Sequence, residues 1–240
     1  MDRQSMVERP QIRDNLSRVQ ERIAAAAQRA GRRNEDITLI GVSKTHPAEA
    51  IRAAYEAGLR HFGENRVQEW EGKRAALSDL NATWHLVGHL QSNKAARAAG
   101  LFHSVDSLDD FGLAQRLERA RGDVTGSKKL RVLLEVRVEE EESKSGAKIE
   151  EAAALAGKAS ALSHIELAGL MCIPPFLEDS EKVRPYFRRL REVRDSLACE
   201  IGRELPVLSM GMSHDFEVAI EEGATEVRVG TAIFGSRPIK

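Results

Sequence analysis

This sequence of 240 residues is poor in cysteine, in net charge and in long apolar runs. Its two cysteines, Cys172 and Cys199, have no further Cys or His at metal-ligand spacing, so neither a disulfide framework nor a zinc site is indicated. Basic and acidic residues number 36 and 37, and a net charge of -1 gives no overall field to attract nucleic acid. No apolar run approaches the roughly 20 residues that span a bilayer, so no membrane partner is expected. Together these absences predict a cytoplasmic protein.

The N-terminal segment has the periodicity of an amphipathic helix. Apolar residues recur there at steps of three and four, and Gly31 follows as a typical C-terminal cap; they are Ile12, Leu16, Val19, Ile23, Ala27 and Ala30. We therefore predict an additional N-terminal helix over residues 9–31.

From residue 36 onward, short β-rich runs alternate with helical stretches. The runs are ITLIGVSK, RHFGE, TWHLVGH, LFHSVDS, LRVLLEVRV, IELAGLMCI, LPVLSMG and TEVRVG. Eight such units without a linker predict a (β/α)8 TIM barrel over residues 36–237, in one domain that covers residues 1–240. An open doubly wound sheet is the alternative, because periodicity alone does not separate the two folds.

Lys44 ends the first of these runs. Ile40, Val42 and Lys44 share one strand face, which places the lysine at the carboxyl end of the strand, pointing into the barrel mouth. An enclosed lysine loses hydration of its charged form, so its amine becomes free to attack a carbonyl. The alternative is a strand-end lysine paired with a carboxylate such as Glu64.

Two consecutive turns near the C-terminus have the composition of a phosphate site. Gly211 permits a tight turn after the seventh run, and Ser213 is placed to cap the following helix. Gly230 and Thr231 follow the eighth run and again offer a hydroxyl and free backbone N–H groups. Loops after strands seven and eight hold phosphate in many barrels, so the pair of turns favours phosphate over ordinary turn and cap roles.

Arg228 lies between two valines in the eighth run. If the valines pack outward, the guanidinium points into the lumen, where a buried charge needs a partner. One candidate partner is a pyridine nitrogen, which an arginine would keep unprotonated because it only donates hydrogen bonds. A salt bridge to a lumen carboxylate such as Glu135 is the other.

The chain resembles a known family over almost its whole length. The matching segments are LIGVSKTHPAEAIRAAYEAGLRHFGENRVQE, WHLVGHLQSNK, HSVDS, GLMCIPPF, RPYFRRLR and LSMGMSHDFEVAIEEGATEVRVGTAIFG. They resemble the pyridoxal phosphate homeostasis proteins (YggS/PROSC family), which share the alanine racemase N-terminal-domain-like barrel, PLP fold type III.

The resemblance implies that the cofactor is pyridoxal 5'-phosphate (PLP), held as a Schiff base on Lys44. It implies that Ser213, Gly230 and Thr231 bind the phosphate and that Arg228 faces the pyridine nitrogen. The resemblance also implies that Asn65 near the ring substituents and Met210 against the ring complete the pocket.

The chain departs from the family pattern after the fifth run. EVRVEEEESKSG replaces a segment nearer QVNVSGEESK, so Arg137, Glu139 and Glu140 stand where smaller residues are usual. Lys144 still matches and is a candidate second attachment point for the cofactor. Cys172 is expected to be a packed small hydrophobe rather than a redox switch.

Three functions use such a site. A PLP-dependent amino-acid racemase needs an acid/base group on each face of its substrate, but Tyr55 and Tyr186 fall in predicted helices, which leaves His89 and Lys144 as possible substitutes. A Schiff-base aldolase would not account for Arg228. The resemblance implies the third function, a PLP-binding protein of vitamin B6 homeostasis that acts as a monomer without substantial catalysis of its own. Such a protein can pass PLP to PLP-dependent apoenzymes.

Overall fold

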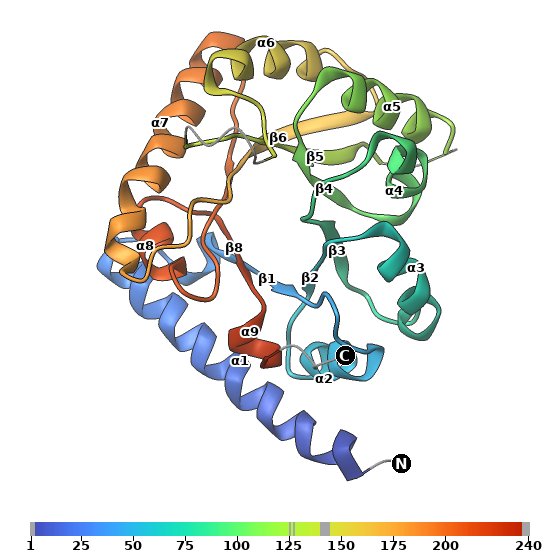
Figure 1. Cartoon of the computed structure of the whole chain (residues 1–240), viewed down its shortest axis with the longest axis vertical. Coiled ribbons are helices and arrows are strands. Elements are labelled where there is room, and N and C mark those ends of the chain that lie inside the picture. The colour runs from blue at the N-terminus through green and yellow to red at the C-terminus, as the bar shows by residue number, and fades with distance from the viewer. Residues whose placement is uncertain (1–2, 125, 127, 140–144, 237–240) are drawn as a thin grey trace.

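Parallel strands close into a barrel that is surrounded by helices (Figure 1). The computed structural model describes residues 3–124, 126, 128–139 and 145–236. In this part of the chain the eight strands are β1 (Thr38–Val42), β2 (His61–Glu64), β3 (Thr83–Leu86), β4 (Ser104–Leu108), β5 (Leu130–Glu135), β6 (Ile165–Met171), β7 (Val207–Ser209) and β8 (Glu226–Val229). They pair in chain order, and β8 pairs with β1. The predicted barrel is confirmed, and the open sheet is excluded.

The outer ring consists of one main helix after each of these strands. These helices are α2 (Ala48–Glu56), α3 (Val67–Arg74), α4 (Ala95–Leu101), α5 (Phe111–Gly122), α6 (Ile149–Ser160), α7 (Arg184–Ile201), α8 (Phe216–Glu221) and α9 (Thr231–Phe234). Short 3-10 turns lie at η1 (Asn34–Asp36), η2 (Ala75–Leu77), η3 (Ser92–Lys94) and η4 (Ser180–Val183).

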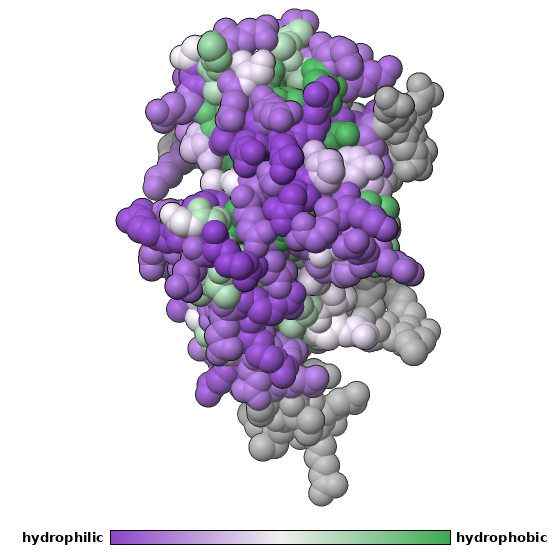
Figure 2. Space-filling model, turned by 90° about the vertical axis from the view of Figure 1, so that its left-hand side faces the viewer, coloured by the Kyte–Doolittle hydropathy of each residue, from purple (hydrophilic) through white to green (hydrophobic). Residues whose placement is uncertain are grey.

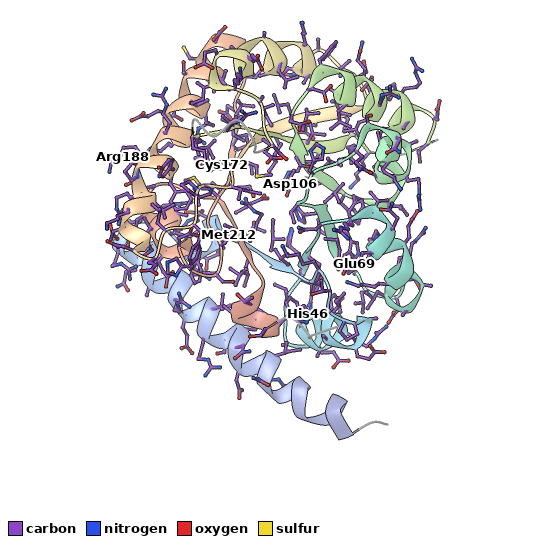
Figure 3. The ribbon with its side chains drawn as sticks, viewed as in Figure 1. His46, Glu69, Asp106, Cys172, Arg188 and Met212 are labelled. Carbon is purple, nitrogen blue, oxygen red and sulfur yellow. The ribbon has the colours of Figure 1, made fainter. Side chains whose placement is uncertain are left out.

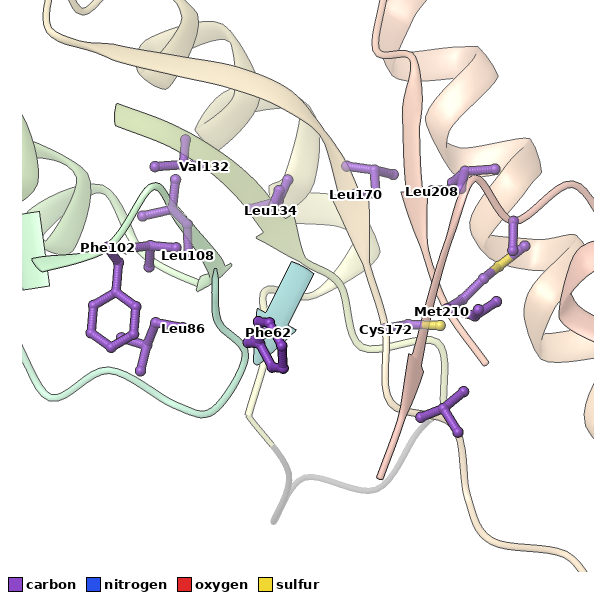
Figure 4. Packing of buried hydrophobic residues seen from close by; sticks show 14 of the residues in the cluster. Phe62, Leu86, Phe102, Leu108, Val132, Leu134, Leu170, Cys172, Leu208 and Met210 are labelled. Carbon is purple, nitrogen blue, oxygen red and sulfur yellow. The ribbon is translucent and has the colours of Figure 1, made fainter. Parts of the chain in front are cut away.

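The main hydrophobic core lies between the strands and this ring of helices. Its strand residues alternate with lumen residues, as two-residue periodicity requires, and Figure 4 shows Phe62, Leu134, Leu170 and Leu208 among them. The core is continuous around the barrel and includes buried side chains from every main helix from α2 to α9.

A further helix, α1 (Arg3–Arg29), packs across the outside of α2, α8 and α9 (Figure 1). The predicted apolar stripe is buried up to Ala27, whereas Ala30 is only half-buried. The helix begins at Arg3, before the predicted start at residue 9. The prediction missed residues 3–8 because they do not continue the apolar steps of three and four. It ends before Gly31, which adopts a left-handed φ of 65° while the Arg32 N–H bonds the Ala27 carbonyl at 2.9 Å.

The barrel lumen is filled by a second, smaller set of residues. Ile40, Val87, Leu133 and Met171 are buried but stand outside the core that faces the helices. A Cβ on Gly63 would lie 3.1 Å from the Ile40 side chain and 3.3 Å from that of Val87, which brings these three positions together inside the barrel. The lumen is therefore packed, with no open pore at this level.

The outer surface is mostly polar. On the face drawn in Figure 2, the side of α7 in Figure 1, hydrophilic residues predominate and apolar residues occur in small groups. Within the described residues, none of the helices combines the length and apolar character that a membrane-spanning helix requires.

Gly169 of β6 marks a close approach to the neighbouring strand β7. A Cβ at this position would overlap the carbonyl oxygen of Val207 in β7 and lie 2.6 Å from its carbonyl carbon. We expect Gly169→Ala to lower the free energy of unfolding by about 1–3 kcal/mol or more, because backbone has to move. Exposed Gly157 in α6 has nothing within 4 Å of its Cβ position, so Gly157→Ala should be neutral or stabilise by about 0.5–1 kcal/mol.

Urea denaturation of both variants checks this prediction. Equal midpoints for Gly169→Ala and the wild type would show that β6 and β7 do not need the close approach.

Candidate functional site at the carboxyl ends of the strands

The turns that follow β7, β8 and β1 meet at one point of the barrel rim. Parallel pairing aligns Arg228 of β8 with Ile40 of β1, so the two strands end side by side. The Ser213 hydroxyl, after β7, accepts the N–H of Gly230 at 3.3 Å and that of Ala232 at 3.4 Å. A Cβ on Gly230 would lie 3.2 Å from the Val42 carbonyl oxygen at the end of β1. The structure thus brings the two predicted phosphate turns together and sets them against the strand that precedes Lys44.

The turn after β7 differs from its prediction in one respect. Gly211 has a left-handed φ of 92°, and a Cβ there would lie 2.6 Å from that of Ala219, which explains the glycine. The prediction that Ser213 caps the following helix is wrong, because Asp215 occupies the N-cap position of α8. The Asp215 carboxylate accepts the Met212 N–H at 2.6 Å, and this turn delays the start of the helix beyond Ser213.

Lys44 lies in a turn just beyond β1. The strand ends at Val42, and the His46 N–H bonds the Ser43 carbonyl at 3.1 Å to close the turn around a half-buried Lys44. The Glu64 carboxylate, the alternative partner considered for Lys44, accepts the Ser43 hydroxyl at 2.7 Å and pairs with the Lys73 ammonium at 3.1 Å. Lys73 is therefore the cation that balances buried Glu64.

Arg228 points into the lumen, as the flanking valines predicted. Its guanidinium donates to the Ser209 carbonyl at 2.7 Å, to the Ser209 hydroxyl at 2.8 Å and to the Cys172 carbonyl at 2.8 Å. Among the described residues these partners are all uncharged, and the guanidinium forms no ion pair with Glu135. The buried positive charge is therefore held by neutral oxygens of β7 and of Cys172.

Glu135, at the end of β5, is a buried carboxyl group near this site that sequence reasoning treated only as a partner for Arg228. The pKa of Glu135 is raised to about 7: burial and then the charge of Asp109 raise it, and Arg228 and His89 oppose the rise. Asp109 in turn lies 3.3 Å from the His89 ring nitrogen. The mouth of the barrel therefore contains a carboxyl group that changes its charge near neutral pH.

The remaining predicted pocket residues occupy different surroundings. Asn65, at the end of β2, is half-buried and lines a groove of about 680 Å³ together with His89 and Lys94. Met210 is fully buried in the hydrophobic core, close to Cys172 (Figure 4). Its place against a bound ring stays a prediction.

Cys172 and the loop after β5 were also singled out by the sequence. Burial raises the pKa of the Cys172 thiol to about 12, which agrees with a packed, unreactive side chain. Arg137 bonds the Gly146 carbonyl at 3.2 Å and lines a surface pocket with Glu139. Glu140 and Lys144 lie outside the described residues.

A second polar cluster lies deeper in the lumen. Of the described residues, His85, Asp106 and Glu226 are the one group of His, Cys, Asp or Glu side chains close enough to share a metal ion. The His85 ring pairs with the Asp106 carboxylate at 3.3 Å, and Glu226 pairs with Arg131 at 2.7 Å. Figure 3 shows Asp106 toward the centre of the ring of strands. The three side chains are thus already engaged with one another or with Arg131.

Comparison with known proteins identifies the family. The alanine racemase N-terminal domain family matches residues 14–238. The curated relative from Aquifex aeolicus is 49% identical over 93% of this chain and 97% of its own length, and that from Escherichia coli K12 is 42% identical over 94% and 97%. Both are named pyridoxal phosphate homeostasis protein. The chain belongs to the pyridoxal phosphate homeostasis protein family.

Solved structures agree with this assignment. PipY of Synechococcus elongatus, in a structure with PLP bound, is 38% identical, with a TM-score of 0.84 over 94% of this chain and 100% of that chain. Alanine racemase of Corynebacterium glutamicum shares the fold at 19% identity, with a TM-score of 0.69 over 93% of this chain and 62% of its own. The homeostasis protein fold thus corresponds to only part of a racemase chain.

The raised pKa of Glu135 predicts a pH dependence of stability. A carboxyl group with a higher pKa when folded binds more protons in the native state, so its contribution to stability is present below its unfolded pKa and falls as the pH rises toward about 7. Between pH 5 and pH 8, the wild type should lose roughly 1–3 kcal/mol more of its free energy of unfolding than Glu135→Gln. Denaturant titration of the ligand-free proteins measures the difference, and exposed Glu204→Gln is the control. Parallel pH profiles for wild type and Glu135→Gln would contradict the prediction.

Proposed function

We propose that this chain binds PLP as a Schiff base on Lys44 and acts in intracellular PLP homeostasis, without substantial catalysis of its own. The observation that carries the proposal is the junction of three turns, in which Ser213 bonds the Gly230 N–H and Gly230 lies against the end of β1. An amine and a phosphate-binding turn at adjacent strand ends suit a ligand that carries both an aldehyde and a phosphate.

The polar groups of the site fit this cofactor. Ser213, Gly230 and Thr231 would hold the phosphate through hydroxyl and backbone N–H groups. Arg228 supports the fit most directly, because within the described part of the chain its buried guanidinium bonds only neutral oxygens, and it can donate to an unprotonated pyridine nitrogen. Asn65 would lie near the ring substituents and Met210 against the ring. PLP, when bound, supplies an electrophilic aldehyde and an electron-withdrawing ring.

The same residues argue for a carrier rather than a racemase. An arginine that only donates keeps the pyridine nitrogen unprotonated, which weakens the ring as an electron sink. Tyr55 lies in α2, with the Arg60 guanidinium 4.1 Å above its ring, and Tyr186 lies in α7. Neither tyrosine is at a strand end, where a base could reach a substrate on the cofactor.

The proposal extends to the protein's partners and setting. We infer one PLP-binding domain over residues 1–240 that acts as a monomer in the cytoplasm and can pass PLP to PLP-dependent apoenzymes. No nucleic-acid or membrane partner is part of this function. The charge balance, with 36 basic and 37 acidic residues, supports the exclusion of nucleic acid.

Lys44→Ala tests the site. The wild type incubated with PLP should absorb between roughly 410 and 430 nm, and borohydride should fix the cofactor on the Lys44 peptide. The variant should lose this band, because Lys73, the described amine next to this turn, is engaged with Glu64, Glu69 and the Ser43 carbonyl. Lys129→Ala, an exposed residue just before β5 at the opposite end of the barrel, is the matched control and should keep it. A colourless wild type, or a band that survives in Lys44→Ala, would remove the proposal.

An amino-acid assay separates the carrier from the racemase. The loaded wild type should convert L-alanine to D-alanine no faster than free PLP at the same concentration. Turnover that depends on Lys44 would favour a PLP-dependent racemase instead.

A further inference from the structure

Two charged side chains of α3 form hydrogen bonds with the backbone on both sides of Lys44. Lys73 of α3 donates to the Ser43 carbonyl at 3.1 Å, and the same ammonium lies 2.7 Å from the Glu69 carboxylate. Glu69 also accepts the Thr45 N–H. Residues 43 and 45, the two neighbours of Lys44, are therefore both tied to one helix.

These hydrogen bonds are needed because the backbone of the turn is strained at Thr45. Thr45 has a φ of 67°, and it is the sole residue other than glycine with a positive φ in the described ranges. A β-branched residue pays a free-energy penalty of roughly 1–3 kcal/mol in this region, so the conformation persists only where its surroundings fix it. The bond from Thr45 to Glu69 is a contact that can do so.

Lys73 in turn fixes Glu69. Its ammonium is largely buried and also pairs with Glu64, which is fully buried and accepts the Ser43 hydroxyl at 2.7 Å. An ammonium held by two carboxylates and a carbonyl has little freedom to move. Figure 3 shows Glu69 and His46, the second residue after Lys44, on the same side of the barrel, near α2 and α3.

We propose that Glu69, braced by Lys73, is a positioning residue that holds the left-handed turn at Thr45 and thereby aims Lys44 at its aldehyde. This inference rests on the proposed function of Lys44. Glu69 itself does not touch the cofactor. Without the Thr45 anchor, the turn relaxes toward ordinary backbone conformations, and the Lys44 amine spends less time where it can react.

Glu69→Ala is the primary test, because Glu69 is partly exposed and its removal leaves the Lys73–Glu64 pair in place. Glu69→Gln keeps an oxygen that can accept the Thr45 N–H and serves as the conservative rescue. The matched control is Glu71→Ala, because Glu71 lies on the same helix as Glu69. This change removes the carboxylate that Arg97 bonds and leaves the contacts of residues 43–45 unchanged.

Two ligands distinguish a role in positioning Lys44 from a general disruption of the binding site. PLP binding, followed by the Schiff-base absorption band, requires both the phosphate turns and Lys44. Pyridoxine 5'-phosphate has an alcohol in place of the aldehyde, so its binding, measured by calorimetry, requires the turns but no reaction with Lys44.

We expect Glu69→Ala to slow formation of the absorption band and weaken PLP binding by about tenfold or more, which corresponds to release of the strain at Thr45. Pyridoxine 5'-phosphate should bind Glu69→Ala within about twofold of the wild type, since the phosphate turns are unchanged. Glu69→Gln should recover most of the PLP affinity and rate, and Glu71→Ala should match the wild type with both ligands.

Either of two results would overturn the inference: equal PLP kinetics in Glu69→Ala and Glu71→Ala, or an equal loss of both ligands in Glu69→Ala. Lys44→Ala is measured alongside. If that variant keeps the band, the proposed function itself fails; if it loses the band while Glu69→Ala behaves as the wild type, only the positioning role fails.

Discussion

Closure of the barrel between β8 and β1 is the constraint on which the site depends. Residues more than 180 positions apart in the chain become neighbours there, because Arg228 pairs in register with Ile40 and Val229 with Gly41. Without this closure, the turn that carries Lys44 and the turn that begins at Gly230 would lie at opposite edges of an open sheet. The small size of Gly230 then lets the two turns touch.

The lumen shows how one barrel keeps several charges buried. Toward the amino ends of the strands, Arg131 pairs with Glu226 and the His85 ring lies 3.3 Å from the Asp106 carboxylate. Burial raises the pKa of Glu226, and the charge of Asp106 raises it too, while Arg131 opposes the rise. Toward the carboxyl ends, Arg228 is held by neutral oxygens instead. The first group pairs its carboxylates within the protein, although Arg131 and Glu226 keep buried polar atoms without a hydrogen-bond partner. The second leaves a buried cation that forms no ion pair within the described residues.

Much of this arrangement follows from local patterns in the sequence. All eight β-rich runs contain strands, and the lumen position of Arg228 follows from strict two-residue alternation between outward-facing valines. The requirement for glycine at positions 211 and 230 could be predicted, because a tight turn or a close approach of backbone leaves no room for a side chain.

Other features needed three-dimensional contacts that no local pattern encodes. The Ser213 hydroxyl was expected at the cap of α8, but it bonds the turn after β8. The bonds from Glu69 and Lys73 to the backbone of Thr45 and Ser43 join the turn after β1 to α3. Glu69 and Lys73 have the spacing of a helical ion pair, but no local pattern indicates that they bind residues 43 and 45. The raised pKa of Glu135 likewise depends on burial among groups from other strands.

A crystal structure of the protein soaked with PLP is the most direct test of the central claim that these strand ends form one cofactor site. The account predicts continuous density from the Lys44 amine to the cofactor. It also predicts phosphate oxygens about 3 Å from the Ser213 hydroxyl and the Gly230 and Thr231 N–H groups, with the Arg228 guanidinium facing the pyridine nitrogen. Cofactor density on another lysine, or in the groove beside Asn65 with the turns after β7 and β8 empty, would contradict it.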